Sequence, residues 1–162
     1  MTKDRSFSFI WCNRVVPERH PAWFIDALNT DDLNEERSVL LGMIPSVHSE
    51  PAAKEQSYIL ENLPENLECY DFVDPVSYYQ QSRFFVFPAK YTFANFALLE
   101  AMSYGVVPII SNVEGTDLIV QDNYNGLVFD LTKEGLYQAM LRAAQLSDED
   151  YERLSNQARQ TI

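Results

Sequence analysis

Glu100 is the acidic residue whose surroundings most suggest a role in binding. It lies in the stretch FALLEAM, in which every other residue is apolar. An ionised carboxylate in a dry interior costs several kcal/mol unless it is paired or hydrogen-bonded. The pattern therefore predicts a buried Glu100 that accepts hydrogen bonds. The partner is either a ligand, or an arginine or backbone amides in a purely structural role.

Two arginines form a second candidate group. Arg14 and Arg19 flank a segment directly after the apolar run 6–12, and His20 follows them. Two guanidinium groups can neutralise a diphosphate through paired, charge-assisted hydrogen bonds. The alternatives are ion pairs with Glu18 or Asp26, or plain solvation of both side chains.

The elements that must position these residues alternate along the chain. Short apolar runs of strand length alternate with longer stretches of helical spacing, a pattern typical of a parallel sheet covered by helices. We expect strands at 6–12, 37–41, 67–72, 83–87, 106–110 and 126–129. Helices are expected after Pro21 and Pro51, at 76–82 and 96–104, briefly within 113–120, and twice at the end of the chain, with a loop at 45–50.

Two local signals fix helix ends in this reading. Gly105 suits the left-handed residue that closes the helix at 96–104. Ser147 and Asp150 form a capping box for the last helix.

Open parallel sheets bind ligands beyond the carboxyl ends of their strands, where the strand order reverses. Arg14 and Arg19 follow the first strand, so the sequence predicts that they lie at such a crevice.

Composition and charge exclude several classes of protein. With 46% hydrophobic and 13% aromatic residues, the 162-residue chain can bury a core. Twelve Lys and Arg against 24 Asp and Glu give a net charge of −12, which disfavours nucleic acid and anionic membranes as partners. No apolar run approaches the ~20 residues of a spanning helix, and the start lacks the features of a signal peptide. The two cysteines, Cys12 and Cys69, are expected to be reduced thiols of a cytoplasmic protein.

The motifs of several common enzyme classes are missing from the sequence. His20 and His48 have no metal-ligand spacing, so metal dependence is disfavoured. Neither a GxGxxG nor a GxxxxGK[ST] loop occurs, which excludes typical NAD-dependent dehydrogenases and P-loop NTPases. No GxSxG elbow occurs either, so covalent hydrolase chemistry has no support. A receiver-like domain needs acidic residues after its first strand, where this chain has Asn13 and Arg14.

Taken together, the motifs resemble the carboxy-terminal half of a retaining glycosyltransferase of the GT-B architecture, group one or family four. The segment 13–19 is similar to the family's Gly-Arg-Leu-x-x-Glu-Lys loop, and 69–73 to its Phe-x-Gly-Phe-Val segment. The segments 87–89 and 98–108 are similar to its Pro-Ser and Leu-Glu-Ala-Met-Ala-x-Gly-x-Pro-Val signature. The match continues through 112–119 and 123–127.

The resemblance implies a fold and a set of roles. The fold is α/β, a Rossmann-like three-layer sandwich with a parallel sheet of about six strands. The segment 1–162 would be a single donor-binding domain, and the acceptor domain of the parent protein would precede it. The donor would be a UDP-, GDP- or ADP-sugar, bound without a metal or other cofactor, and a hexosyl group would be transferred with retention. Donor-binding residues would be Arg14, Arg19, Phe72, Val73, Asn95, Phe96 and Glu100, with Arg14 and Arg19 on the diphosphate and Glu100 on the ribose.

The chain departs from the family pattern at one position that matters for catalysis. The family pairs two glutamates in the spacing Glu-x7-Glu, and Thr92 occupies the place of the first. A one-residue insertion would put Tyr91 there instead, and neither residue is acidic. The glycine-rich residues ahead of the family's helix are replaced here by Phe93, Ala94 and Asn95. These changes favour a second hypothesis, in which a degenerate glycosyltransferase-like module acts as a binding or stabilising partner. Whether the protein contacts a membrane is left open by the sequence.

Overall fold

The computed structural model describes residues 5–43, 50–92 and 95–162. Its centre is a six-stranded parallel sheet with the order β3-β2-β1-β4-β5-β6. The strands are β1 (Phe7–Cys12), β2 (Ser38–Leu41), β3 (Leu67–Tyr70), β4 (Ser82–Phe87), β5 (Val107–Ser111) and β6 (Leu127–Phe129). The predicted α/β, Rossmann-like fold with a parallel sheet is confirmed.

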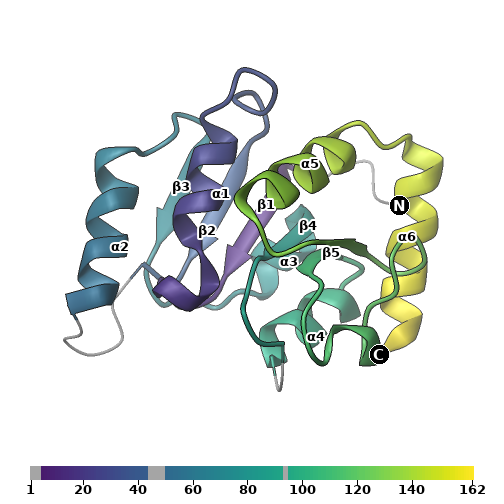
Figure 1. Ribbon diagram of the computed structural model, residues 1–162. Helices are drawn as coiled ribbons and strands as arrows, with labels where there is room; N and C mark the ends of the chain where they lie inside the picture. Colours follow the sequence, from purple (N-terminus) through teal and green to yellow (C-terminus); the bar gives the residue numbers. More distant parts are fainter. Residues whose placement is uncertain (1–4, 44–49, 93–94) are drawn as a thin grey trace.

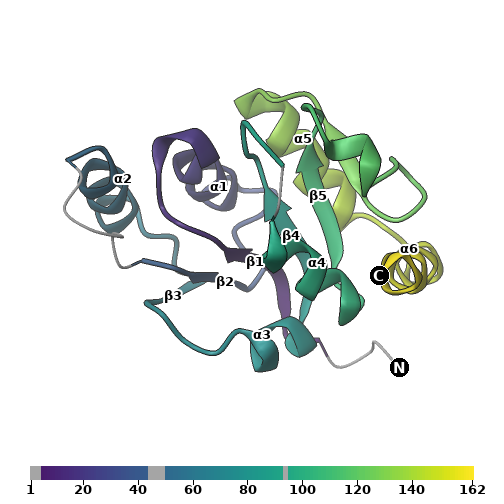
Figure 2. The same cartoon turned by 90° about the horizontal axis from the view of Figure 1, so that it is seen from below.

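Helices cover both faces of the sheet (Figures 1 and 2). They are α1 (Pro21–Leu28), α2 (Glu50–Glu61), α3 (Val76–Gln81), α4 (Phe96–Ser103), α5 (Lys133–Ala144) and α6 (Asp148–Thr161). Two short 3-10 helices, η1 (Pro17–Arg19) and η2 (Thr116–Leu118), lie between them. Helices α1, α2 and α5 lie on one face and α3 and α4 on the other, while α6 packs against α4 and β5.

The apolar core has one part on each face of the sheet. In β4, Phe84 belongs to the cluster under α1 and α5, whereas Phe85 and Phe87 belong to the cluster under α3 and α4. Aromatic side chains on both sides of one strand are typical of a central, doubly covered strand. The central position predicted for 83–87 is therefore confirmed, since β4 pairs with both β1 and β5.

The strand order reverses between β1 and β4. From β1 the chain moves outward through β2 and β3, then crosses back to β4 and continues to β6. The carboxyl ends of the strands lie at the lower edge in Figure 1, so the view from below in Figure 2 looks onto them. Ligand sites of doubly wound sheets lie at this reversal. Here the two segments that meet there are the loop after Cys12 and the loop after Phe87.

The element boundaries differ from the expected ones by small amounts. The third strand ends at Tyr70 and not at Phe72, because residues 71–75 form a bend that leads into α3. Gly105 has φ 74°, as expected for the residue that ends α4, and Ser147 Oγ caps α6 by accepting from the Asp150 amide at 3.1 Å. The expected loop at 45–50 and the interpretations of His48, Phe93 and Ala94 fall mostly or wholly outside the described residues.

Candidate functional site

Asn13, the first residue after β1, has a firmly held backbone. Its N–H donates to the Leu41 carbonyl at 3.3 Å, and its carbonyl accepts from Trp11 Nε1 at 3.2 Å. The end of β2 approaches the same peptide, where Gly42 leaves room because it has no side chain. This arrangement places the side chain of Asn13 at the strand reversal.

The loop that follows Asn13 is short and conformationally restricted. Pro17 starts η1, and His20 ends it in the left-handed region with φ 52° while it also precedes α1. The His20 ring stacks on Trp23 with centroids 3.8 Å apart and an angle of 6°. Burial lowers the pKa of His20, although the charge of Glu18 opposes this shift. The stacked ring and the left-handed residue fix the backbone at the end of this loop, next to Arg19.

Arg14 and Arg19 are brought together by this loop. Arg14 is exposed, whereas Arg19 is half-buried with its guanidinium 6.0 Å from the centre of the Phe87 ring. Burial, and then the charge of Arg14, lowers the pKa of Arg19. The charge of Glu18 opposes this shift. Two positive charges on one short loop favour the binding of an anion there.

The ion pairs that would have given these arginines a structural role are not formed within residues 5–43, 50–92 and 95–162. Neither Arg14 nor Arg19 makes an ion pair there. Asp26, one of the two expected partners, instead binds Lys133 Nζ at 2.7 Å. Arg19 donates a short hydrogen bond to Asn13 Oδ1, a neutral acceptor that leaves its charge uncancelled.

The loop after β4 joins the loop after β1. The backbone N–H of Lys90 donates to the carbonyl of Glu18 at 3.0 Å. Asn95 caps α4, since its Oδ1 accepts from the Leu98 amide at 2.8 Å, and its Nδ2 lies 3.4 Å from Asn13 Oδ1. The exposed Lys90 adds a further cation to this edge of the sheet. Sequence reasoning missed both Asn13 and Lys90 as site residues, although each closely follows the end of a strand.

The expected burial of Glu100 is wrong, because its side chain is exposed. The core contacts of α4 are made by Leu98, Ala101 and Met102, and the helix buries only that face. An exposed Phe96 shows the same effect, with 77% of its surface accessible. A short run of apolar residues in the sequence therefore does not predict that every face of the helix is buried.

The charge of Glu100 nevertheless acts on residues at the carboxyl end of β1. Burial raises the pKa of the Cys12 thiol, and the charge of Glu100 raises it further. The same carboxylate contributes to the raised pKa of Tyr79, for which burial is again the largest cause. Tyr79 donates its hydroxyl to Cys12 Sγ at 3.2 Å, so this side of the crevice is well ordered. In the described part of the chain the Glu100 carboxylate has no hydrogen-bond partner, which leaves it available to a ligand.

The other predicted site residues divide into two groups. Thr92 is only 1% exposed, and its Oγ1 donates to the Glu114 carbonyl at 3.0 Å, so its hydroxyl is used inside the protein. Phe72 and Val73 follow β3 and are 79% and 39% exposed. They lie at the same edge of the sheet as Asn13, but two strands away from β1. The structure thus brings Arg14, Arg19 and Asn95 to the strand reversal, places Glu100 on the helix that starts there, and leaves Phe72 and Val73 at the periphery.

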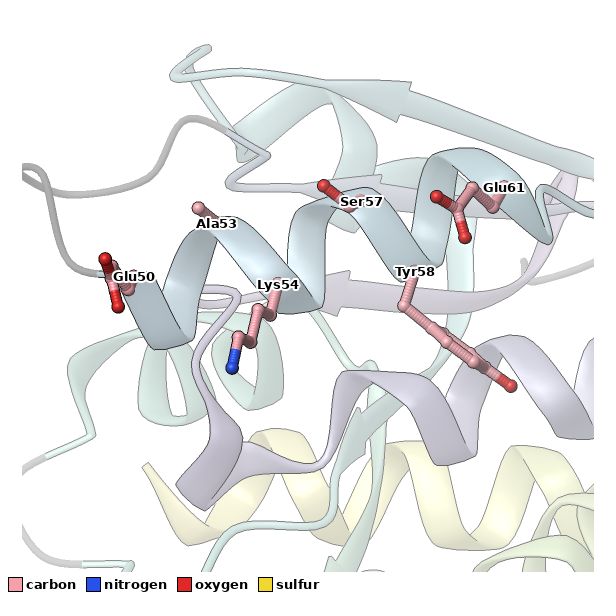
Figure 3. A pocket seen from close by; sticks show the side chains of 6 residues that line it. All are labelled: Glu50, Ala53, Lys54, Ser57, Tyr58 and Glu61. Carbon is pink, nitrogen blue, oxygen red and sulfur yellow. The ribbon is translucent and has the colours of Figure 1, made fainter.

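A hollow of about 500 Å³ lies elsewhere, along the outer side of α2 (Figure 3). Its lining comes from that single helix: Glu50, Ala53, Lys54, Ser57, Tyr58 and Glu61. Both signs of charge are present, and Tyr58 already donates its hydroxyl to Asp26 at 2.5 Å. None of the predicted site residues lines this hollow, so the crevice at the strand reversal is the candidate site.

The described residues, 5–43, 50–92 and 95–162, contain neither a metal-binding cluster nor a membrane-spanning helix. No group of three or more His, Cys, Asp or Glu side chains in them is arranged to hold a metal ion. None of their helices has the length and apolar character that crossing a bilayer requires.

Comparison with protein families decides the classification. The family model described as "Glycosyl transferases group 1" matches residues 6–145. The chain belongs to this family. The group 1 glycosyltransferase match covers all six strands, both basic residues of the first loop and Glu100. None of the curated proteins compared with this group 1 domain matches it.

Solved structures of glycosyltransferases share the fold of this group 1 domain. The pneumococcal O-GlcNAc transferase GtfA, solved with UDP and GlcNAc, superimposes with a TM-score of 0.76 at 20% identity over 97% of this chain. Sucrose-phosphate synthase from Thermosynechococcus elongatus gives 0.82 at 17% identity over 99%. Anabaena Alr3699/HepE, solved with UDP and glucose, gives 0.79 at 15% identity over 96%. The domain spans only 32%, 41% and 43%, respectively, of these three chains.

Proposed function

We propose that this domain binds the nucleoside diphosphate sugar donor of a glycosyltransferase. The observation that carries the proposal is the placement of Arg14 and Arg19 in one loop at the strand reversal, where neither makes an ion pair within the described residues. In a chain of net charge −12, two such cations in one loop mark a site for a compact, multiply charged anion. A diphosphate has this charge and size.

The arginines also have a role in the proposed transfer step. As the bond between the sugar and the diphosphate breaks, negative charge accumulates on the leaving diphosphate. Fixed guanidinium groups stabilise that charge electrostatically. They can therefore do so without a divalent metal. Retention at the transferred carbon is proposed on the family resemblance alone.

Glu100 is proposed to accept hydrogen bonds from the ribose hydroxyls of the donor. Its carboxylate has no partner in the described part of the chain and is close enough to Cys12 to shift the pKa of that thiol. Asn95 and Phe96, at the start of the same helix, would contact the donor between Glu100 and the arginines. Phe72 and Val73 are proposed to contact the nucleobase, which requires the donor to extend along the sheet edge toward β3. UDP is the first nucleotide to test, because two of the three similar structures described above contain it.

The acceptor sugar or protein is proposed to bind a further domain of the parent protein. The similar chains are more than twice as long as this one, which leaves room for such a domain. In this proposal 1–162 is a single donor-binding domain. The free thiols of Cys12 and Cys69 support a cytoplasmic location, where thiols stay reduced.

The second candidate function is a degenerate module that binds a nucleotide but does not transfer sugar. It is favoured by Thr92, whose buried hydroxyl is committed to the Glu114 carbonyl and offers no carboxylate to the sugar. Donor hydrolysis by the parent protein separates the two: an active enzyme releases UDP from its UDP-sugar, and a degenerate module binds the donor without turnover.

Isothermal titration calorimetry of the domain with uridine, UMP and UDP tests donor binding. We expect the affinity to rise in that order, because each phosphate adds contacts with Arg14 and Arg19. A charge-assisted hydrogen bond contributes about 1.5–3 kcal/mol, so UDP is expected to bind at least about tenfold more tightly than uridine. Equal affinities for the three ligands, or no binding of UDP, would contradict the proposal.

A further inference from the structure

The side-chain amide of Asn13 has one atom that the fold leaves unpaired. Nδ2 of Asn13 is buried and has no hydrogen-bond partner among residues 5–43, 50–92 and 95–162. An amide N–H removed from water without an acceptor is destabilising, and native proteins keep few of them. The orientation of the Asn13 side-chain amide, which leaves Nδ2 unpaired, therefore requires a physical explanation.

Two neighbouring donors dictate the orientation of the amide. Arg19 donates to Oδ1 of Asn13, and Nδ2 of Asn95 approaches the same oxygen at 3.4 Å. A guanidinium has only donors, so turning the amide over would place Nδ2 against Arg19. The oxygen therefore accepts from the two donors, and Nδ2 is left without a partner. The backbone of Asn13, held by Leu41 and Trp11, cannot move to relieve this arrangement.

Asparagine and aspartate would hold Arg19 in different ways. A carboxylate at this position would bind the guanidinium through a stronger, charge-assisted pair and would carry no orphaned N–H. It would also cancel the positive charge that Arg19 presents to an anion. A neutral amide oxygen holds the guanidinium in place and leaves its full charge to attract a ligand.

We propose that Asn13 is a positioning residue, which fixes Arg19 and Asn95 across the strand reversal while keeping the charge of Arg19 available for the diphosphate. This inference rests on the proposed function, since it assigns a role toward the same ligand. Asn13 links the loop after β1 to Asn95, the N-cap of α4, and so connects the proposed diphosphate site to the helix that carries Glu100. The unpaired Nδ2 is the stability cost of this role.

The variants Asn13→Asp and Asn13→Ala test the role, each with and without Arg19→Met, by calorimetric titration of UDP and uridine. Both single variants are expected to weaken UDP binding about tenfold and to change uridine binding by less than about twofold. In the Arg19→Met background, Asn13→Ala is expected to cause a clearly smaller loss than in the wild-type background, because Asn13 acts mainly through Arg19 and only in part through Asn95. Urea unfolding of Asn13→Asp is expected at the wild-type midpoint or above it, so stability and UDP affinity do not fall together.

Asn156→Asp is the matched control. Asn156 Oδ1 accepts from Arg159 at 3.3 Å on α6, so the substitution makes the same charge change beside an arginine outside the site. It is expected to leave UDP affinity unchanged. Two results would overturn the role of Asn13 but not the proposed function. One is wild-type affinity of Asn13→Asp for UDP, and the other is an equal loss of UDP affinity from Asn13→Ala in the wild-type and Arg19→Met backgrounds. A wild-type domain that binds no UDP would instead overturn the proposed function.

Discussion

Replacing Gly42 with alanine is expected to destabilise the domain by about 3 kcal/mol or more. Gly42 has φ 114°, a conformation that L side chains rarely adopt, and an added Cβ would lie 2.2 Å from the carbonyl oxygen of Asn13. That carbonyl accepts from Trp11 Nε1, and the whole peptide is fixed between β1 and β2, so it cannot yield. Equilibrium urea unfolding measures the change.

Ser57→Ala is the control for this prediction, because Ser57 is exposed on α2 and far from the strand reversal. Surface substitutions of this kind change stability by about 0.5 kcal/mol or less. If Gly42→Ala unfolded at the same urea concentration as Ser57→Ala, the tight approach of β2 to Asn13 would be incorrect. The firm backbone on which the proposed site depends would then be in doubt.

The double variant Arg14→Met, Arg19→Met is expected to lose UDP affinity by about 100-fold or more. Each guanidinium is assigned charge-assisted hydrogen bonds to the diphosphate, worth about 1.5–3 kcal/mol apiece, and the two losses together exceed about 3 kcal/mol. Uridine carries no phosphate, so its affinity is expected to stay within about twofold of wild type. Calorimetric titrations of both ligands at one salt concentration measure the difference.

Arg142→Met, Arg153→Met provides the matched control. Both arginines bind Asn123 in the turn before β6, and their removal changes the net charge by the same amount. Their loss is expected to leave UDP binding unchanged apart from a small, salt-dependent effect. Comparable losses of UDP affinity in the two double variants would mean that overall charge attracts the nucleotide, and not the loop after β1.

The arrangement of strands and helices was largely predictable from the sequence. Strands such as 83–87 are continuous apolar runs, because both of their faces are covered, and such runs stand out from the helical spacing around them. Local signals also placed helix ends correctly, at Gly105 for α4 and at Ser147 for α6. The end of β3 was misplaced because Phe72 is apolar yet exposed.

The site was predictable only in part. The position of Arg14 and Arg19 after the first strand follows from the topology of parallel sheets, which is why it could be inferred. The exposure of Glu100 could not be predicted, because the residue types around it do not indicate which face of α4 the sheet covers. The unpaired Nδ2 of Asn13 could not be predicted either, because it depends on two donors that come from different loops. Contacts between distant segments carry no local signal in the sequence.

The most direct test of the central claim is an NMR titration of the isotopically labelled domain with UDP, observing the backbone amides. In the proposed complex one ligand contacts both the loop 14–20 and the helix that carries Glu100. We therefore predict that chemical-shift changes concentrate in 13–20 and 95–101, with matching dependence on UDP concentration. Shifts confined to 50–61, around the hollow on α2, or shifts in the arginine loop without any in α4, would contradict it.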